Sequence, residues 1–262
     1  MAAGPGELDP MNGRRHEGIL GVDIGGSGIK AAVVDTATGR LLSERHRVPT
    51  PAPTSPDAFS RAVRKVINHL EYSGPVGCCF PTIVVDGEAR SASNLGEHWI
   101  GVCVEDVFAD ATRLPFKVVN DADAAGVAEM RLGAGRDLDG TVITITIGTG
   151  IGSGMFHNGA LVPNLELGHM PGFDGEPIER YASGNARKRD ELSWPEWGQR
   201  FDYFLRKAAR VCTPDHFILS GGASKKFDKF RKEVTVSTPC HVAEFLNDAG
   251  IVGAALVAAE SR

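Results

Sequence analysis

Two glycine-rich turns, one near the start of the chain and one past its middle, constrain the fold more than any other feature of the sequence. Residues 23–28 read DIGGSG, and residues 146–152 read TIGTGIG. Each turn lies between two runs of β-forming residues, which predicts a β-hairpin in both places. The backbone N–H groups of such turns form a nest that suits phosphate. Two nests in one chain predict two half-domains that hold one phosphate chain between them.

Other interpretations of the turns agree less well with their surroundings. A dinucleotide-binding turn opens a helix, whereas residues 29–34 (IKAAVV) continue as a strand. A Walker A loop requires the pattern GxxxxGK[ST], which the chain does not contain. A third interpretation, in which these are ordinary tight hairpins whose glycines supply a positive φ, stays open from the turns alone.

The predicted elements follow a similar order in the two halves of the chain. The first half contains a three-stranded meander, a helix that starts at Ser55-Pro56, two strands and an Ala-rich helix: 18–47, 57–72, 76–80, 116–119 and a helix ending at Met130. The second half contains a meander, two helices, a strand and a helix: 141–162, 176–189, 194–212, 217–219 and 247–259. The repeated order predicts a duplicated α/β fold with a ligand between its halves.

Asp121 is the strongest candidate for a catalytic side chain. It follows a β-rich run and precedes a helix, so we expect it at the carboxyl end of a strand, where ligand sites of α/β proteins collect. A carboxylate near a helix N-terminus stays ionised and can accept a proton. The alternative is that Asp121 only caps the helix, because Asp is common at that position.

Further candidates lie in the second half of the chain. Glu166 and His169 occupy a polar loop and suit hydrogen bonds to sugar hydroxyls, although a solvated loop would look the same. Glu179, taken alone, is a charge on a surface helix. A basic cluster after the glycine pair 221–222 is either a solvated face or a surface that holds a long polyanion: Lys225, Lys226, Lys229, Arg231 and Lys232.

Composition excludes several classes of function. The net charge of −5 provides no basic field for nucleic acid. No apolar stretch is long enough to span a bilayer, and residues 1–17 lack the apolar segment of a signal peptide, so we expect a cytoplasmic protein with a disordered tail over 1–17. The five cysteines include no CxxC pair, which is typical of a reducing compartment and argues against a structural zinc site.

Several of these motifs together resemble the ROK family of sugar kinases, which have the actin/hexokinase-like ATPase fold. Residues 23–30 (DIGGSGIK) and 146–152 are similar to the family's two phosphate motifs. Residues 120–123 (NDAD) match the motif with the catalytic base, and residues 166–169 (ELGH) match the sugar-binding motif. Residues 179–184 (ERYASG) match the segment that supplies another sugar-binding Glu.

The resemblance extends from Gly18 to the C-terminus and implies two duplicated α/β lobes with a cleft between them. The implied small lobe is 18–119 and the large lobe 120–248, with helix 249–262 packed back on the small lobe. Asp121 would be the catalytic base, and a loop with Trp99 would lie near the sugar. The implied sugar-binding residues are Asn94, Asn120, Asp121, Glu166, His169 and Glu179. The implied donor-binding residues are Asp23, Gly25, Gly26, Ser27, Gly28, Lys30, Thr146, Gly148, Thr149, Gly150, Gly152, Gly221, Gly222, Lys225, Lys226 and Lys229.

Within the family, the strings at 187–197, 221–226 and 247–255 resemble members that use inorganic polyphosphate. The resemblance implies phosphoryl transfer from polyphosphate, or from ATP, to the 6-hydroxyl of glucose, with Mg²⁺ held by the donor phosphates near Asp23. The cysteine-rich zinc segment of many ROK proteins is absent, so no structural zinc is expected. An ATP-dependent kinase for glucose, mannose or another hexose, and a non-catalytic sugar-binding regulator, stay as alternatives. We expect a homodimer without nucleic acid or membrane partners.

Overall fold

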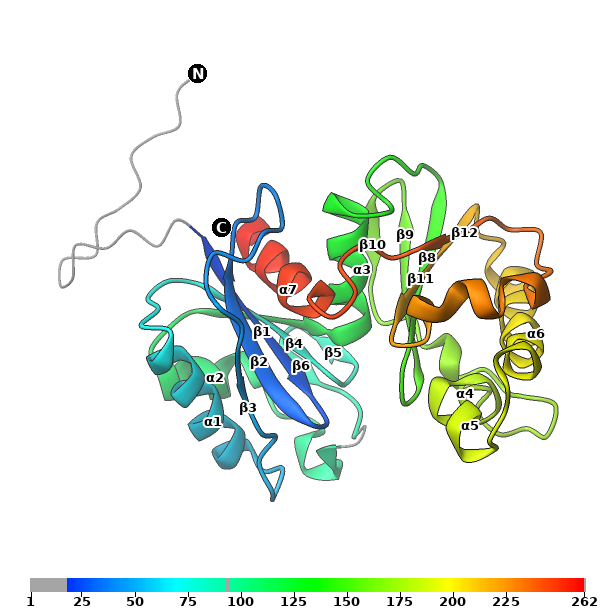
Figure 1. Cartoon of the computed structure of the whole chain (residues 1–262). Helices are drawn as coiled ribbons and strands as arrows, with labels where there is room; N and C mark the ends of the chain where they lie inside the picture. The colour runs from blue at the N-terminus through cyan, green and yellow to red at the C-terminus, as the bar shows by residue number, and fades with distance from the viewer. Residues whose placement is uncertain (1–17, 93–94, 262) are drawn as a thin grey trace.

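Two five-stranded β-sheets form the framework of the protein, and each is built around one of the glycine turns (Figure 1). The architecture is that of a computed structural model, which describes residues 18–92 and 95–261. The predicted disordered tail (1–17) and the predicted sugar ligand Asn94 lie outside the described residues.

The first sheet consists, in order, of β3 (His46–Val48), β2 (Gly28–Val34), β1 (Ile19–Gly25), β4 (Val76–Phe80) and β7 (Phe116–Asn120). β1 and β2 pair antiparallel on either side of the first glycine turn, which confirms the predicted hairpin. β3 pairs antiparallel with β2, so the predicted three-stranded meander is also confirmed. β4 and β7 extend the sheet parallel to β1.

The second sheet consists of β10 (Ala160–Val162), β9 (Ile151–His157), β8 (Thr141–Ile147), β11 (His216–Gly221) and β12 (Cys240–Val242). The second glycine turn joins β8 to β9 in an antiparallel hairpin, as predicted. β11 and β12 run parallel to β8, so strand order and strand directions repeat those of the first sheet. The predicted duplicated α/β fold is confirmed.

Helices cover both faces of each sheet (Figure 1). α1 (Pro56–His69) and α2 (Val104–Thr112) pack on the outer face of the first sheet, and α6 (Trp194–Cys212) packs on the outer face of the second. α3 (Asp121–Leu132) and α7 (Ala249–Glu260) lie side by side between the two sheets and form a third buried cluster with strands of both. The described residues therefore form three main apolar layers, one on the outer face of each sheet and one between the sheets.

The last helix returns to the first sheet because small residues allow close packing. A Cβ at Gly77 of β4 would collide with the carbonyl of Ala254, and a Cβ at Gly253 would collide with the carbonyl of Ala124 in α3. The chain thus passes between the sheets twice, once through α3 and once through residues 243–248. The lobe boundaries 18–119, 120–248 and 249–262 stay predictions.

Several local elements differ from the sequence-based expectation. The helix expected over 176–189 is two short helices, α4 (Glu179–Ala182) and α5 (Gly184–Arg189), because Ser183 is extended and caps α5. α2 and β12 were not predicted. The remaining short elements are the hairpin β5 (Val84–Val85) and β6 (Glu88–Ala89), and the 3₁₀ turns η2 (Glu97–Trp99), η3 (Leu167–His169), η4 (Ser224–Lys229) and η5 (Arg231–Glu233). Across 18–92 and 95–261, no helix combines the length and apolarity needed to cross a membrane.

Candidate active site

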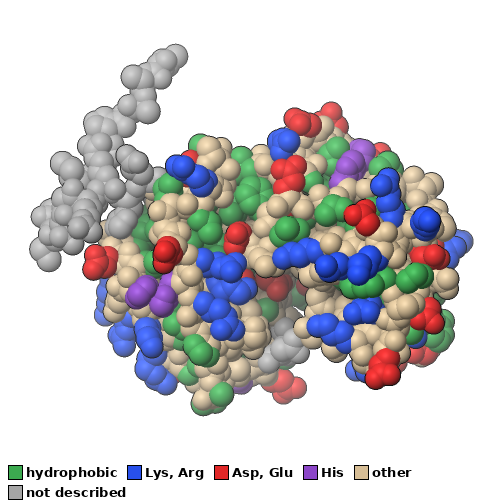
Figure 2. All heavy atoms as spheres, in the orientation of Figure 1, with side chains coloured by type: hydrophobic (Ala, Val, Ile, Leu, Met, Phe, Trp, Pro, Cys, Tyr) green, Lys and Arg blue, Asp and Glu red, His purple; other side chains and the backbone are tan. Residues whose placement is uncertain are grey.

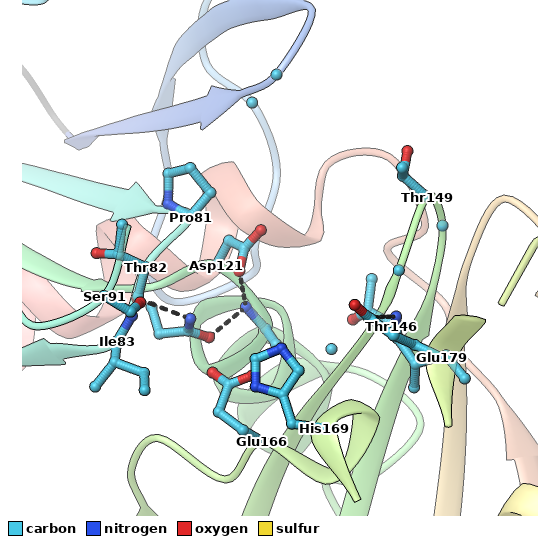
Figure 3. Close-up of a pocket in the computed structure, with 18 residues that line it drawn as sticks. Pro81, Thr82, Ile83, Ser91, Asp121, Thr146, Thr149, Glu166, His169 and Glu179 are labelled. Carbon is cyan, nitrogen blue, oxygen red and sulfur yellow. Dashed lines mark hydrogen bonds between the residues drawn. The ribbon is translucent and has the colours of Figure 1, made fainter. Parts of the chain in front are cut away.

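A cavity of about 500 Å³ lies between the two sheets, at the carboxyl ends of their parallel strands (Figure 3). Its volume is within the range of small-molecule sites, and its walls come from both halves of the duplication. The structure brings most of the predicted sugar-binding residues and much of both glycine turns to this cavity: Gly25, Gly26, Asn120, Asp121, Thr146, Gly148, Thr149, Gly150, Gly152, Glu166, His169 and Glu179.

Asp121 is the first residue of α3, and its carboxylate faces the cavity (Figure 3). The helix cap is Asn120, whose Oδ1 accepts the N–H groups of Ala122 (2.8 Å) and Asp123 (3.1 Å). The capping role considered for Asp121 therefore belongs to its neighbour. Asn120 Nδ2 donates to the Thr82 carbonyl (2.9 Å), which leaves one amide N–H for a ligand.

The electrostatic environment makes Asp121 a stronger base than an ordinary carboxylate. The side chain is open to the cavity, but protein surrounds it on the other sides. Burial, reinforced by the negative charges of Asp23 and Glu166, raises the pKa of Asp121 to about 6, against a weaker opposing hydrogen bond from Ala122. At pH 7 the carboxylate is still about nine-tenths ionised, so it can accept a proton.

Two further carboxylates and a histidine converge on the same cavity (Figure 3). Burial raises the pKa of Glu166, His169 opposes this rise, and Glu179 adds to it. Glu179 accepts the backbone N–H of Ile151 (2.9 Å) through Oε2, so it is not the surface charge that its helix alone predicts. A Cβ at Gly150 would collide with this carboxylate, which accounts for one glycine of the second turn.

The glycines at the tips of the two turns are not explained by backbone conformation. Neither Gly26 nor Gly148 has a φ in the left-handed region. A Cβ at either position would meet no protein atom within 4 Å. The interpretation of these turns as ordinary hairpins that need positive-φ glycine is therefore wrong for these two residues. Bare backbone there leaves room for a ligand to approach the turn.

Asp23 is held by two donors beside the first turn. Lys30 Nζ donates to its Oδ2 (2.8 Å), and the Cys79 thiol donates to its Oδ1 (3.3 Å). Lys30 is one of the implied donor-binding residues, but its charge is already compensated by Asp23. Neither side chain lines the cavity.

The remaining predicted donor residues do not line the cavity. Gly221 has a φ of 83°, and a Cβ there would lie 2.5 Å from the carbonyl oxygen of Ile147, so the fold itself requires this glycine. Lys225 lines a second, shallower hollow that also contains Arg45 and Asp248. The predicted residues that do not line the main cavity are Asp23, Ser27, Gly28, Lys30, Gly221, Gly222, Lys225, Lys226 and Lys229. Their donor-binding roles stay predictions.

Part of the cavity wall comes from residues that were not predicted from the sequence. Thr82 and Ser91 line it, and the hydroxyls of Thr82 and Thr146 are buried without a protein partner in the described ranges 18–92 and 95–261. The residues after strand 76–80 were the available signal, since loops at strand ends build such sites. Trp99, from the loop expected near the sugar, does not itself line the cavity; it is a core residue whose ring packs on Phe80, with centroids 4.8 Å apart.

Asp123 is a further acidic group that sequence reasoning did not assign. It is only 1 % exposed, and its Oδ2 accepts the backbone N–H of Asn164 (2.8 Å) at the start of the Glu166 loop. Burial raises the pKa of Asp123 to about 7; the hydrogen bond from Asn164 opposes this rise, and the negative charges of Glu166 and Asp121 add to it. The side chain thus connects α3 to the loop that carries Glu166 and His169.

Comparisons of sequence place the chain beside known sugar kinases. Residues 19–186 match the ROK family. A polyphosphate glucokinase of Mycobacterium tuberculosis (strain CDC 1551 / Oshkosh) is 39% identical over 238 residues, which cover 90% of this chain and 89% of the relative. A polyphosphate glucokinase of Mycobacterium leprae (strain TN) is 38% identical over 243 residues, covering 92% of this chain and 74% of the relative.

Solved structures show the same relationship. An inorganic polyphosphate/ATP-glucomannokinase from Arthrobacter sp. strain KM superposes with a TM-score of 0.89 at 42% identity, covering 94% of this chain and 99% of the other. A ROK family glucokinase from Streptomyces griseus, in complex with glucose and AMPPNP, superposes with a TM-score of 0.72 at 27% identity, covering 92% and 99%. The two-lobed architecture is thus the expected actin/hexokinase-like fold, and the chain belongs to the ROK family.

Proposed function

We propose that the protein is a kinase that transfers the terminal phosphoryl group of inorganic polyphosphate to the 6-hydroxyl of glucose, giving glucose 6-phosphate. The observation that carries the proposal is the placement of Asp121, whose pKa of about 6 suits a base at neutral pH, in a cavity walled by both glycine turns. The polyphosphate glucokinases at 39% identity support the choice of donor and sugar.

The chemistry assigned to the cavity is a single in-line displacement. Asp121 accepts the proton of the 6-hydroxyl while that oxygen attacks the terminal phosphorus. The P–O bond to the next phosphate breaks, and the donor leaves one phosphate shorter. The N–H groups of the two turns would bind donor oxygens, and so would the Thr146 hydroxyl, which is buried and has no hydrogen-bond partner among the residues described.

The sugar would be oriented by side chains that already have one fixed contact each. Asn120 has one amide N–H left, and Glu179 has Oε1 left after binding Ile151 through Oε2. Glu166 and His169 complete the polar wall from η3. Fixed partners reduce the freedom that these groups would lose on binding glucose, which favours a defined orientation of its hydroxyls.

Magnesium would accompany the donor phosphates near Asp23 and Asp121. Across 18–92 and 95–261, no group of three or more His, Cys, Asp or Glu residues is arranged to hold a metal by itself. The site nevertheless fits a divalent cation held mainly by the donor phosphates, because the Asp121 carboxylate lines the cavity and Mg²⁺ prefers carboxylate oxygens, while both oxygens of Asp23 already accept hydrogen bonds. When bound, Mg²⁺ would offset charge on the transferring phosphoryl group.

Donor and sugar range are the finer parts of the proposal. The exposed side chains of Lys225, Lys226 and Lys229 support a long phosphate chain that continues past the transferred group. The Arthrobacter neighbour is named for both donors and for glucose and mannose, so ATP and mannose are the second candidates. We also propose a cytoplasmic homodimer, consistent with the five free cysteines.

A matrix of donors and sugars tests the proposal directly. Purified protein with Mg²⁺ is offered polyphosphate or ATP together with glucose, mannose or fructose, and phosphorylated sugar is measured. We expect the highest kcat/KM for polyphosphate with glucose. No sugar phosphate from any pair would favour the non-catalytic sugar-binding alternative, and turnover with ATP alone would favour the ATP-dependent one.

A further inference from the structure

A row of charged side chains crosses the first sheet beside the first glycine turn. In the strand register, Asp23 of β1 lies opposite Lys30 of β2, and Lys30 lies opposite Arg47 of β3. Directly paired residues on neighbouring strands point to the same face of a sheet. Ala32 and Val34, on the same face as Lys30, pack in the central cluster with α7. The row therefore lies on the face of the first sheet that is turned towards the second.

Arg47 carries the one uncompensated charge of this row. Lys30 forms an ion pair with Asp23, in which Nζ and Oδ2 are 2.8 Å apart. Arg47 is exposed, and across 18–92 and 95–261 no carboxylate forms an ion pair with it. A free cation beside a nest of backbone N–H groups adds to the field that attracts an anion.

Arg47 also holds the turn itself. Its Nη2 donates to the carbonyl of Ser27 (2.5 Å), and its Nε would lie 2.6 Å from a Cβ at Gly28. Thr50 Oγ1 donates to the carbonyl of Gly25 (2.5 Å). Because the peptide unit is planar, these two contacts fix the orientation of the Gly25 and Ser27 peptide planes and so the shape of the turn.

We propose that Arg47 is a donor-binding residue, whose guanidinium contacts oxygens of the phosphate next to the one transferred. The inference rests on the proposed phosphoryl transfer from a phosphate chain. A guanidinium has five N–H donors, so the contact with Ser27 leaves others for phosphate, which its planar fork matches. Lys and Arg side chains gather on both halves of the face shown in Figure 2, which gives a polyphosphate chain cationic groups on two sides.

Four variants separate charge from support of the turn. Arg47→Gln removes the charge and the guanidinium contact with the Ser27 carbonyl, and Arg47→Lys keeps the charge. Thr50→Val removes the hydrogen bond to the Gly25 carbonyl without changing the charge. Arg210→Gln, on the exposed side of α6 in the other half, is the matched control for loss of one arginine. The measurements are KM for polyphosphate, ATP and glucose, the decline of kcat/KM with added salt, and a thermal melt that reports folding.

We expect Arg47→Gln to raise the KM for polyphosphate roughly tenfold, since one charge-assisted hydrogen-bonding group is lost, with the KM for glucose unchanged. Its kcat/KM should also fall less steeply with salt, as for any polyanion that loses a cationic contact. Arg47→Lys should recover the salt dependence and part of the KM. Thr50→Val should lower kcat while its salt dependence stays that of the unmodified protein.

Two results would overturn the assignment. The first is an Arg47→Gln protein that matches Arg210→Gln in donor KM and salt dependence. The second is an Arg47→Gln protein that behaves like Thr50→Val, which would make Arg47 a support of the turn only. If Arg47→Gln does not fold, the measurement on Arg47→Lys decides. The assignment requires this variant to keep the salt dependence and to recover only part of the donor KM. A normal donor KM together with lost salt dependence would contradict the assignment. Failure of the unmodified protein to use polyphosphate would refute the proposed donor. The KM for ATP, compared between Arg47→Gln and the unmodified protein, would then test the role of Arg47.

Discussion

Replacing Asp121 with Asn should lower the turnover of the enzyme and raise the stability of its fold. The substitution keeps the size of the side chain and the cap, which Asn120 provides, but removes the proton acceptor. Loss of a general base lowers turnover by about 10²-fold or more. The KM for glucose should change little, because Asn120, Glu166 and Glu179 still line the cavity.

The same substitution should stabilise the fold. The pKa of Asp121 rises from 3.8 to about 6 on folding, so the ionised carboxylate disfavours the native state at neutral pH. A rise of about two units corresponds to about 3 kcal/mol, which solvent screening of a side chain open to the cavity reduces to about 1 kcal/mol. Below the unfolded value both states are protonated and there is no penalty; the penalty grows as pH rises from the unfolded value towards the folded value of about 6, and it is complete above that. Asp121→Asn should therefore gain stability at pH 7.5 and none near pH 3.8.

Urea unfolding of both proteins at pH 4 and pH 7.5, with a coupled assay for glucose 6-phosphate, measures both effects. Asp121→Glu is the matched control, since it keeps a carboxylate but displaces it. Near-normal turnover of Asp121→Asn would remove this residue from the base role. Equal stability of Asp121→Asn and the unmodified protein at pH 7.5 would show that the carboxylate is not destabilised by burial or by Asp23 and Glu166.

Three further predictions follow from the same geometry. Because the base must be ionised, kcat/KM should fall as pH drops through about 6, and a pH profile without a limb near that value would contradict the pKa of Asp121. Gly148→Ala meets no protein atom, so it should fold normally in a thermal melt but raise the KM for the donor; an unchanged donor KM would exclude ligand approach at this turn. Neutralising Lys225, Lys226 and Lys229 together should raise the KM for long polyphosphate more than the KM for ATP, whereas equal effects on both donors would refute a chain-binding role.

Local patterns were sufficient for the parts of the fold that depend on neighbours in sequence. The two hairpins follow from runs of β-forming residues on either side of a glycine turn, and helix α1 begins where Ser55 and Pro56 predict it, with Ser55 accepting the N–H of Ala58. Asp121 was predicted from its position between a strand and a helix. These signals depend only on residues that are adjacent in the chain.

The parts that were missed depend on contacts between distant segments. The pairing of Lys30 with Asp23 comes from strand register, and so does the position of Arg47 beside the turn. β12 is a three-residue strand whose only signal is the neighbouring β11. The raised pKa of Asp123 depends on burial under the loop that starts at Asn164, which no local pattern shows.

One measurement tests the central claim most directly. Protein, glucose, Mg²⁺ and polyphosphate of defined length are incubated without nucleotide, and ³¹P NMR follows both the sugar and the chain. We expect glucose 6-phosphate to form, each transfer to shorten the donor by one phosphate, and Asp121→Asn nearly to abolish both signals. Release of inorganic phosphate without glucose 6-phosphate, or an unchanged rate in Asp121→Asn, would contradict the central claim.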